Sequence, residues 1–154
     1  MYHPNPYYYV DGEKKMMSFR LIMDKARKGE PIEVWGDSSR TKEMLYVKDL
    51  TLLIEQAIES DKKGGIYNVG SSKQVSLEEQ IDGIIDVFTD AKRSEKVYCP
   101  EKPDALFNHL DISKTIKDLD YKPQYSYIDW LRDFKLEEEM NRFEKLWGTR
   151  DDYE

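Results

Sequence analysis

Apolar residues recur with the spacing of a helix in five stretches of this chain. The first begins at Met16 and ends at Lys28, where Gly29 can close the last turn. The other four begin near residues whose side chains can accept a hydrogen bond from a free amide of the first turn: Asp49, Ser76, Asp111 and Ser126. Ser76 also forms a capping box with Glu79. The last helix changes the phase of its apolar positions near Lys135, so we expect its packed face to bend or end there.

Four short stretches rich in β-branched and aromatic residues predict strands between these helices: residues 32–35, 44–47, 66–69 and 96–99. The alternation of helices and strands favours an α/β class. Residues 1–15 have no clear period, so we expect a loop-like N-terminal segment there. One packed lobe is then expected at residues 16–147, followed by a frayed tail at residues 148–154.

Composition narrows the classes of partner. A chain of 154 residues suits one domain, and its net charge of −7 argues against nucleic acid or an anionic membrane as a partner. No apolar run approaches the roughly 20 residues that span a bilayer, so we expect a cytoplasmic protein. Cys99 is the only cysteine and there are two histidines, so a metal site is not expected.

Three common catalytic or cofactor-binding motifs are absent or incomplete in this sequence. Gly65 and Gly70 have the spacing of a phosphate loop, but Ser71 stands where that loop needs lysine. No G-x-G-x-x-G is present to bind a dinucleotide. Tyr98 and Lys102 have the Y-x-x-x-K spacing, but the proline between them forbids the helix that would align the two side chains. The residues alone therefore indicate an α/β domain without a catalytic group or cofactor site.

Three blocks of sequence resemble, in their order and spacing, the second half of extended short-chain dehydrogenases that act on nucleotide sugars. The blocks read GEPIEVWGDSSRTKEMLYVKDL from Gly29, GGIYNVGSSKQVSLEE from Gly64 and HLDISKTIKDLDYKPQYSYIDWLRDF from His109. The resemblance covers about residues 14–135. It implies a small mixed α/β lobe that corresponds to the C-terminal part of this family, with the Rossmann core absent. In the family that core binds NAD or NADP and supplies the catalytic residues, so no cofactor site is expected in this chain.

The resemblance also implies a nucleotide-sugar site on the lobe. Val34 and Trp35, with Ile32, match the segment that lies beside the nucleotide base, where an indole can stack. Alternatively, Trp35 simply caps the core. Lys42 stands where the family has an arginine that grips the diphosphate, and Arg40 would lie on the same strand face.

Two further positions complete the implied site. Asn68 matches the asparagine of the family's Y-N-x-G block, which lies near the substrate phosphates or orders the adjoining loop. Glu101 stands where the family often has an arginine, and Lys102 beside it can supply the missing positive charge. With Lys42, the chain departs from the family's diphosphate clamp at two positions.

The leading interpretation is the nucleotide-sugar-binding lobe of an NAD(P)-dependent epimerase, dehydratase or reductase, inactive without its Rossmann domain. One alternative is a stand-alone binding module without chemistry. Another is a structural remnant that forms homo-oligomers through its former interdomain surface. We expect the helix from Asp49 to face the absent domain and to expose an apolar patch there.

Overall fold

The computed structural model describes residues 2–71, 73–104 and 109–154, and its elements confirm a mixed α/β class. In chain order these are β1 (Tyr7–Val10), β2 (Glu13–Met16), α1 (Ser18–Lys28), β3 (Ile32–Trp35), β4 (Thr41–Glu43), α2 (Val47–Glu59), β5 (Gln74–Ser76), α3 (Leu77–Phe88), β6 (Lys96–Cys99), α4 (Ser113–Leu119), α5 (Tyr127–Met140), α6 (Glu144–Trp147) and the 3-10 turn η1 (Arg150–Tyr153). Each helix of these described residues is too short or too polar to cross a lipid bilayer.

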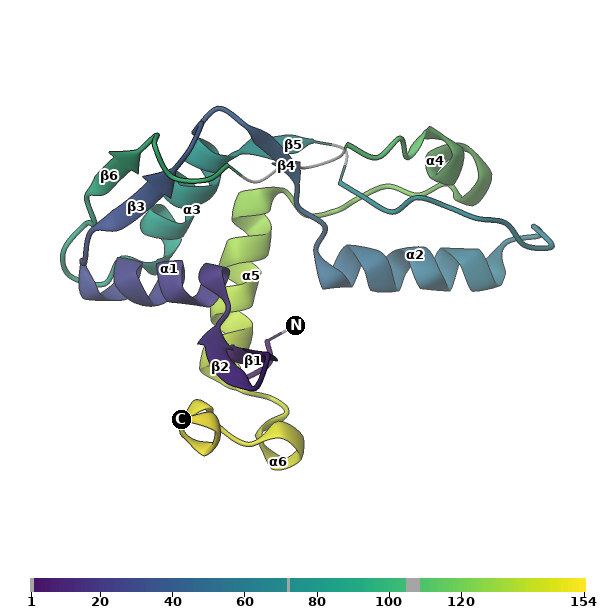
Figure 1. Ribbon diagram of the computed structural model, residues 1–154. Helices are drawn as coiled ribbons and strands as arrows, with labels where there is room; N and C mark the ends of the chain where they lie inside the picture. Colours follow the sequence, from purple (N-terminus) through teal and green to yellow (C-terminus); the bar gives the residue numbers. More distant parts are fainter. Residues whose placement is uncertain (1, 72, 105–108) are drawn as a thin grey trace.

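The strands of the described residues pair as three small two-stranded sheets. Sheet β1–β2 is antiparallel, β3–β6 is parallel and β4–β5 is antiparallel. The strands predicted at residues 32–35 and 96–99 are therefore confirmed, and they lie side by side although about 60 residues separate them (Figure 1).

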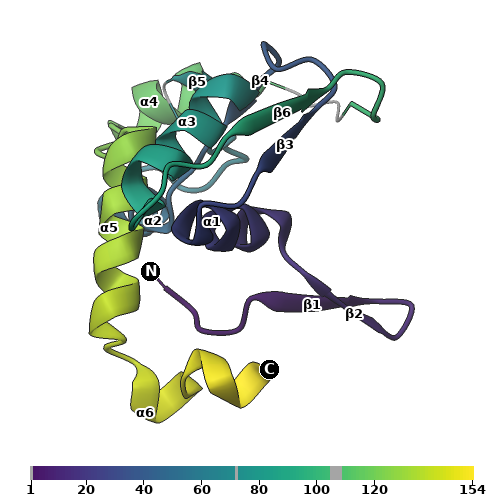
Figure 2. The same cartoon turned by 90° about the vertical axis from the view of Figure 1, so that its left-hand side faces the viewer.

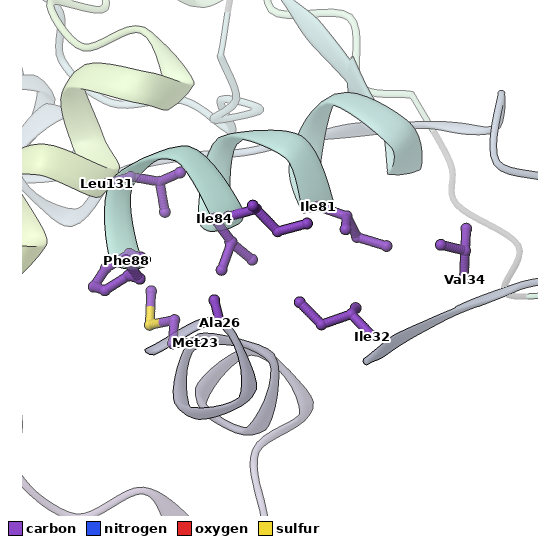
Figure 3. Packing of buried hydrophobic residues seen from close by; sticks show 9 residues of the cluster. Met23, Ala26, Ile32, Val34, Ile81, Ile84, Phe88 and Leu131 are labelled. Carbon is purple, nitrogen blue, oxygen red and sulfur yellow. The ribbon is translucent and has the colours of Figure 1, made fainter. Parts of the chain in front are cut away.

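The main core lies where α1, α3, β3 and α5 meet. Figure 3 shows side chains from these four elements pointing into one space: Met23, Ala26, Ile32, Val34, Ile81, Ile84, Phe88 and Leu131. Gly83 lets α5 approach α3 closely, because a Cβ on Gly83 would stand 2.8 Å from the Ile128 side chain and 2.9 Å from that of Tyr127. The periodic apolar stripes of the sequence therefore meet as one packed body.

A second, smaller core holds α2 and α4 to one side of that body (Figure 1). Its buried members are Leu53, Ile112, Leu119 and Tyr121. Where α2 begins, a charged junction of Lys48, Asp133, Glu137 and Arg142 ties it to α5: the Lys48 ammonium lies 2.7 Å from Asp133 and 2.9 Å from the buried Glu137. The Arg142 guanidinium also donates to Glu137. We therefore expect this junction to hold α2 in its direction relative to α5.

The strand predicted at residues 44–47 is wrong, because β4 ends at Glu43 and α2 already begins at Val47. The Tyr46 hydroxyl donates to Asp133 at 2.5 Å and draws the chain toward α5. Asp49 does not cap the helix as predicted. It lies in the first turn, where its carboxylate accepts hydrogen bonds from the backbone amides of the loop before α5.

The strand predicted at residues 66–69 does not form among the described residues. Ile66 is 91% exposed, and the carbonyl of Asn68 accepts a hydrogen bond from the Thr115 hydroxyl rather than from a neighbouring strand. A strand needs a ladder partner, and propensity alone does not supply one.

Both chain ends are more ordered than predicted. Residues 2–15 are not loop-like, contrary to the prediction for residues 1–15: they contain β1 and most of β2, joined at Asp11 and Gly12, whose φ values of 51° and 82° suit a two-residue hairpin turn. The tail at residues 148–154 is not frayed, because η1 forms there and the two terminal nitrogens of the Arg150 guanidinium donate to Asp24 at 2.6 and 2.9 Å. Figure 2 shows the hairpin and the C-terminal turn on the same side of α1.

Candidate functional site

The alternation of β3 separates a core face from an open face. Ile32 and Val34 are buried in the main core, whereas Glu33 and Trp35 point to the other side of the sheet. Trp35 is 45% exposed and lies opposite Cys99 in the register of the sheet. The strand therefore presents an indole at its carboxyl end, beside the loop that follows β6.

A Trp35 cluster, consisting of Glu33, Trp35 and Lys102, occupies this open face. The indole Nε1 donates to Glu33 Oε2 at 2.7 Å, and the Lys102 ammonium donates to the same oxygen at 2.6 Å. The ammonium also lies 4.4 Å from the centroid of the indole ring. The hydrogen bond from Lys102 lowers the pKa of Glu33, and the same bond raises the pKa of Lys102.

Arg40 fastens the turn that follows Trp35. Its Nη1 donates to the carbonyl of Trp35 at 2.5 Å and to that of Asp37 at 3.1 Å, and it pairs with the Asp104 carboxylate at 2.5 Å. Gly36, with φ 67°, lies inside this turn, where a Cβ would stand 2.9 Å from Asp104. The Arg40 guanidinium thus joins the end of β3 to the loop after β6 and orders the backbone that carries Trp35.

Lys42 and Asn68 lie on other elements. Lys42 is the central residue of β4, opposite Val75 of β5. The Asn68 side-chain amide donates to the carbonyl of Asp111 at 2.9 Å, which favours the loop-ordering role for this asparagine. The two residues that flank Lys42 in β4, Thr41 and Glu43, contact the segment at residues 109–110.

Of the predicted site residues, the structure therefore brings Trp35, Arg40 and Lys102 together. Val34 is fully buried, so its side chain supports the strand and does not reach the open face. Sequence reasoning missed Glu33 and Asp104, which hold Lys102 and Arg40 in place. The period of two in β3 could have identified Glu33, because it shares a face with Trp35, but nothing local predicted the pairing of Asp104.

Two hollows among the described residues lie elsewhere. One of about 650 Å³ is bounded by α3 and α5, and one of about 570 Å³ lies between α3 and the loop that leads into α5. Neither is lined by a predicted site residue. In the described part of the chain, no group of three or more His, Cys, Asp or Glu side chains could hold a metal ion. The Trp35 cluster lies outside both hollows, and all three of its side chains are partly exposed.

Comparison with known proteins agrees with this architecture. The model of the NAD dependent epimerase/dehydratase family matches residues 4–70. A dTDP-4-dehydro-6-deoxy-D-allose reductase of Streptomyces sp is 32% identical over 105 residues, which are 67% of this chain and 31% of that protein. An epimerase of Methanothermobacter thermautotrophicus superposes with a TM-score of 0.65 at 25% identity, over 80% of this chain and 38% of the other.

A solved structure of the UDP-glucuronic acid 4-epimerase of Bacillus cereus, in complex with UDP-glucuronic acid and NAD, is also similar. Its TM-score is 0.60 at 23% identity, over 83% of this chain and 42% of that one, so it shows the fold. These likenesses define a class of protein related to NAD-dependent enzymes of sugar metabolism. The chain belongs to the NAD dependent epimerase/dehydratase family. It spans about a third of the length of the curated relatives it matches.

The described residues do not fit NAD, the cofactor that this family implies. A dinucleotide pyrophosphate needs a glycine-rich turn between a strand and a helix N-terminus. Where a strand runs into α1, the turn residue is Met17, and where β5 runs into α3, the capping box of Ser76 and Glu79 fills the helix N-terminus. Glu78 and Glu79 add negative charge there, which would repel a phosphate. No step of a reaction is therefore assigned to NAD within these residues.

Proposed function

We propose that this chain is the nucleotide-sugar-binding C-terminal lobe of an NAD(P)-dependent sugar epimerase or dehydratase, and that it is not catalytic by itself. The observation that carries the proposal is the outward-facing Trp35 with the Lys102 ammonium beside it. An exposed indole offers a stacking surface to a nucleotide base, and a neighbouring ammonium offers a charge to its phosphates.

The chemistry of the clamp supports a diphosphate ligand held by point charges. Lys42 replaces the family's arginine and keeps the positive charge, but it lacks the planar fork that grips two phosphate oxygens at once. Arg40 contributes indirectly, because its Nη1 is engaged with the carbonyls of Trp35 and Asp37 and with Asp104. We therefore expect weak binding by the chain alone, with the base stacked on Trp35 and the phosphates toward Lys102.

Two features favour a missing partner domain. The apolar residues Ile54 and Ile58 on α2 are 53% and 79% exposed, as expected of a helix that faces an absent domain. The segment at residues 66–69, which the sequence predicts to be a strand, follows α2 and leaves Ile66 almost fully exposed. A sheet edge in the other part of the protein would give this segment its ladder partner and cover α2. The partner we propose is the Rossmann domain.

The part of the reaction that falls to this chain is binding and orientation. Trp35 holds the base, Lys102 holds phosphate charge, and the lobe covers the sugar when it meets its partner domain. We assign proton and hydride transfer to the proposed Rossmann domain, because no helix of the described residues carries a tyrosine and a lysine four residues apart. The lobe therefore contributes ligand affinity and the exclusion of water.

Titration of the chain with UDP-glucose and dTDP-glucose tests this proposal. Binding should shift the indole NMR signal of Trp35 in the wild type, and calorimetric titration should detect no binding to Trp35→Ala. Tyr9→Ala removes an exposed aromatic ring from β1, which belongs to a different sheet, and should leave binding unchanged. Equal loss of binding in both variants, or binding that survives Trp35→Ala, would overturn the site.

The exposed apolar surface of α2 also favours a second candidate, a module that self-associates. Ile54, Ile58 and Ile66 could be covered by a second copy of the chain as well as by a partner domain. Sedimentation at increasing concentration separates the two proposals. Self-association that disappears in Ile58→Lys, together with no response to either nucleotide sugar, would favour the homo-oligomer over the binding lobe.

A further inference from the structure

Glu33 holds both other members of the Trp35 cluster through a single carboxylate oxygen. Its Oε2 accepts from the indole Nε1 at 2.7 Å and from the Lys102 ammonium at 2.6 Å. Glu33 and Lys102 stand 69 residues apart in sequence, so the fold brings them together across the β3–β6 sheet. The carboxylate thereby keeps the ammonium against the indole ring.

This arrangement has two consequences for a ligand. The ammonium covers one face of the indole at 4.4 Å from the ring centroid, so a planar base cannot stack on that face while Lys102 stays there. The ammonium is also already engaged with a carboxylate, and the charge of that carboxylate opposes an approaching phosphate. A phosphate and Glu33 would therefore compete for the same ammonium.

We propose that Glu33 is an internal competitor of the phosphate group, and that binding of a nucleoside diphosphate transfers Lys102 from Glu33 to the phosphate. This inference rests on the proposed function, because it takes Trp35 and Lys102 as the ligand site. It makes the cluster selective: a nucleoside without phosphate cannot displace the carboxylate, whereas a diphosphate can.

Glu33→Gln isolates this competition. The glutamine side-chain oxygen can still accept from the indole Nε1, so Trp35 keeps its support, while the neutral amide no longer holds the ammonium by charge. Both partners of the ion pair are partly exposed, so the fold does not depend on it. An exposed pair of this kind predicts a gain in UDP affinity of about two- to fivefold at low salt.

The test is calorimetric titration of the whole chain with UDP and with uridine. Four proteins are compared: wild type, Glu33→Gln, Lys102→Ala and the double variant. UDP should bind Glu33→Gln about two- to fivefold more tightly than wild type, uridine equally, and the UDP gain should be smaller when Lys102 is already alanine. High salt should reduce the gain. An equal or larger gain without Lys102 would overturn the competition, because it would show simple repulsion by Glu33.

A matched control separates local competition from overall charge. Glu30→Gln removes the same charge three residues earlier at an exposed position, and it should not change UDP affinity. The same gain in Glu30→Gln as in Glu33→Gln would also overturn the inference. No binding of UDP by any of the proteins would overturn the proposed function and this inference with it. UDP binding that is unaffected by Glu33→Gln would overturn this inference alone.

Discussion

The charged junction between α2 and α5 makes the stability of this chain depend on pH. Glu137 is only 4% exposed and interacts with Lys48 and Arg142. Hydrogen bonding from Arg142, with support from Lys48, outweighs burial and lowers the pKa of Glu137 from 4.5 to about 2. Because the folded pKa is the lower one, this stabilisation is fully present above pH 4.5 and is lost as the pH falls toward 2.

The magnitude follows from the pKa shift. Lowering the pKa of Glu137 from 4.5 to about 2 corresponds to roughly 3 kcal/mol, and solvent around the half-exposed Arg142 reduces this to about 2 kcal/mol. We therefore expect Glu137→Gln to lower the free energy of unfolding by about 2 kcal/mol at pH 7. By pH 3.5 the difference between wild type and variant should shrink by about 1 kcal/mol, because wild-type Glu137 begins to lose its advantage there.

Urea unfolding of both proteins at pH 7 and at pH 3.5 measures this difference. Glu139→Gln is the matched control: it removes the same charge from an exposed position two residues further along α5, and it should cost less than about 0.5 kcal/mol at either pH. A cost for Glu137→Gln that is no greater than that of the control, or a cost that does not change with pH, would refute the assignment of the junction.

Two further variants test the packing and the C-terminal turn. Gly83→Val should lower the free energy of unfolding by about 1–3 kcal/mol, because its Cβ would press against Ile128 and push α5 from α3, and urea unfolding measures it. Valine introduced at the exposed Ala57, Ala57→Val, should cost under about 1 kcal/mol, and equal costs would contradict close packing at Gly83. Arg150→Ala should speed amide hydrogen exchange in residues 149–154, because the pair with Asp24 is lost, without changing exchange in α1. Unchanged exchange in the tail would show that Asp24 does not order it.

Most of the helices could be predicted from the sequence, because helical periodicity and capping are local properties. The stripe that ends in Lys28 and Gly29 forms α1, and the capping box of Ser76 and Glu79 begins α3 where predicted. The packed face of the last helix was predicted to bend or end near Lys135. In the structure α5 continues to Met140, but Leu136 and Met140 are exposed while Glu137 is buried.

Two missed features have different reasons. The hairpin at the N-terminus carried a local signal, the Asp11–Gly12 pair, but its strands lack the alternation that identifies a half-buried sheet. The segment at residues 66–69 has strand propensity and still forms no ladder, because pairing depends on a neighbouring strand that the described residues do not provide.

For the candidate site, the sequence by itself determined the kinds of groups involved: an indole at the end of a short strand and basic residues in the matching blocks. Only the tertiary structure decided their partners. Glu33 meets Lys102, and Arg40 meets Asp104, because the parallel pairing of β3 with β6 brings distant loops to one edge of the sheet. The physical reason is the separation of the contacts along the sequence. Helices form from contacts three or four residues apart, whereas ion pairs across strands depend on how the whole chain packs.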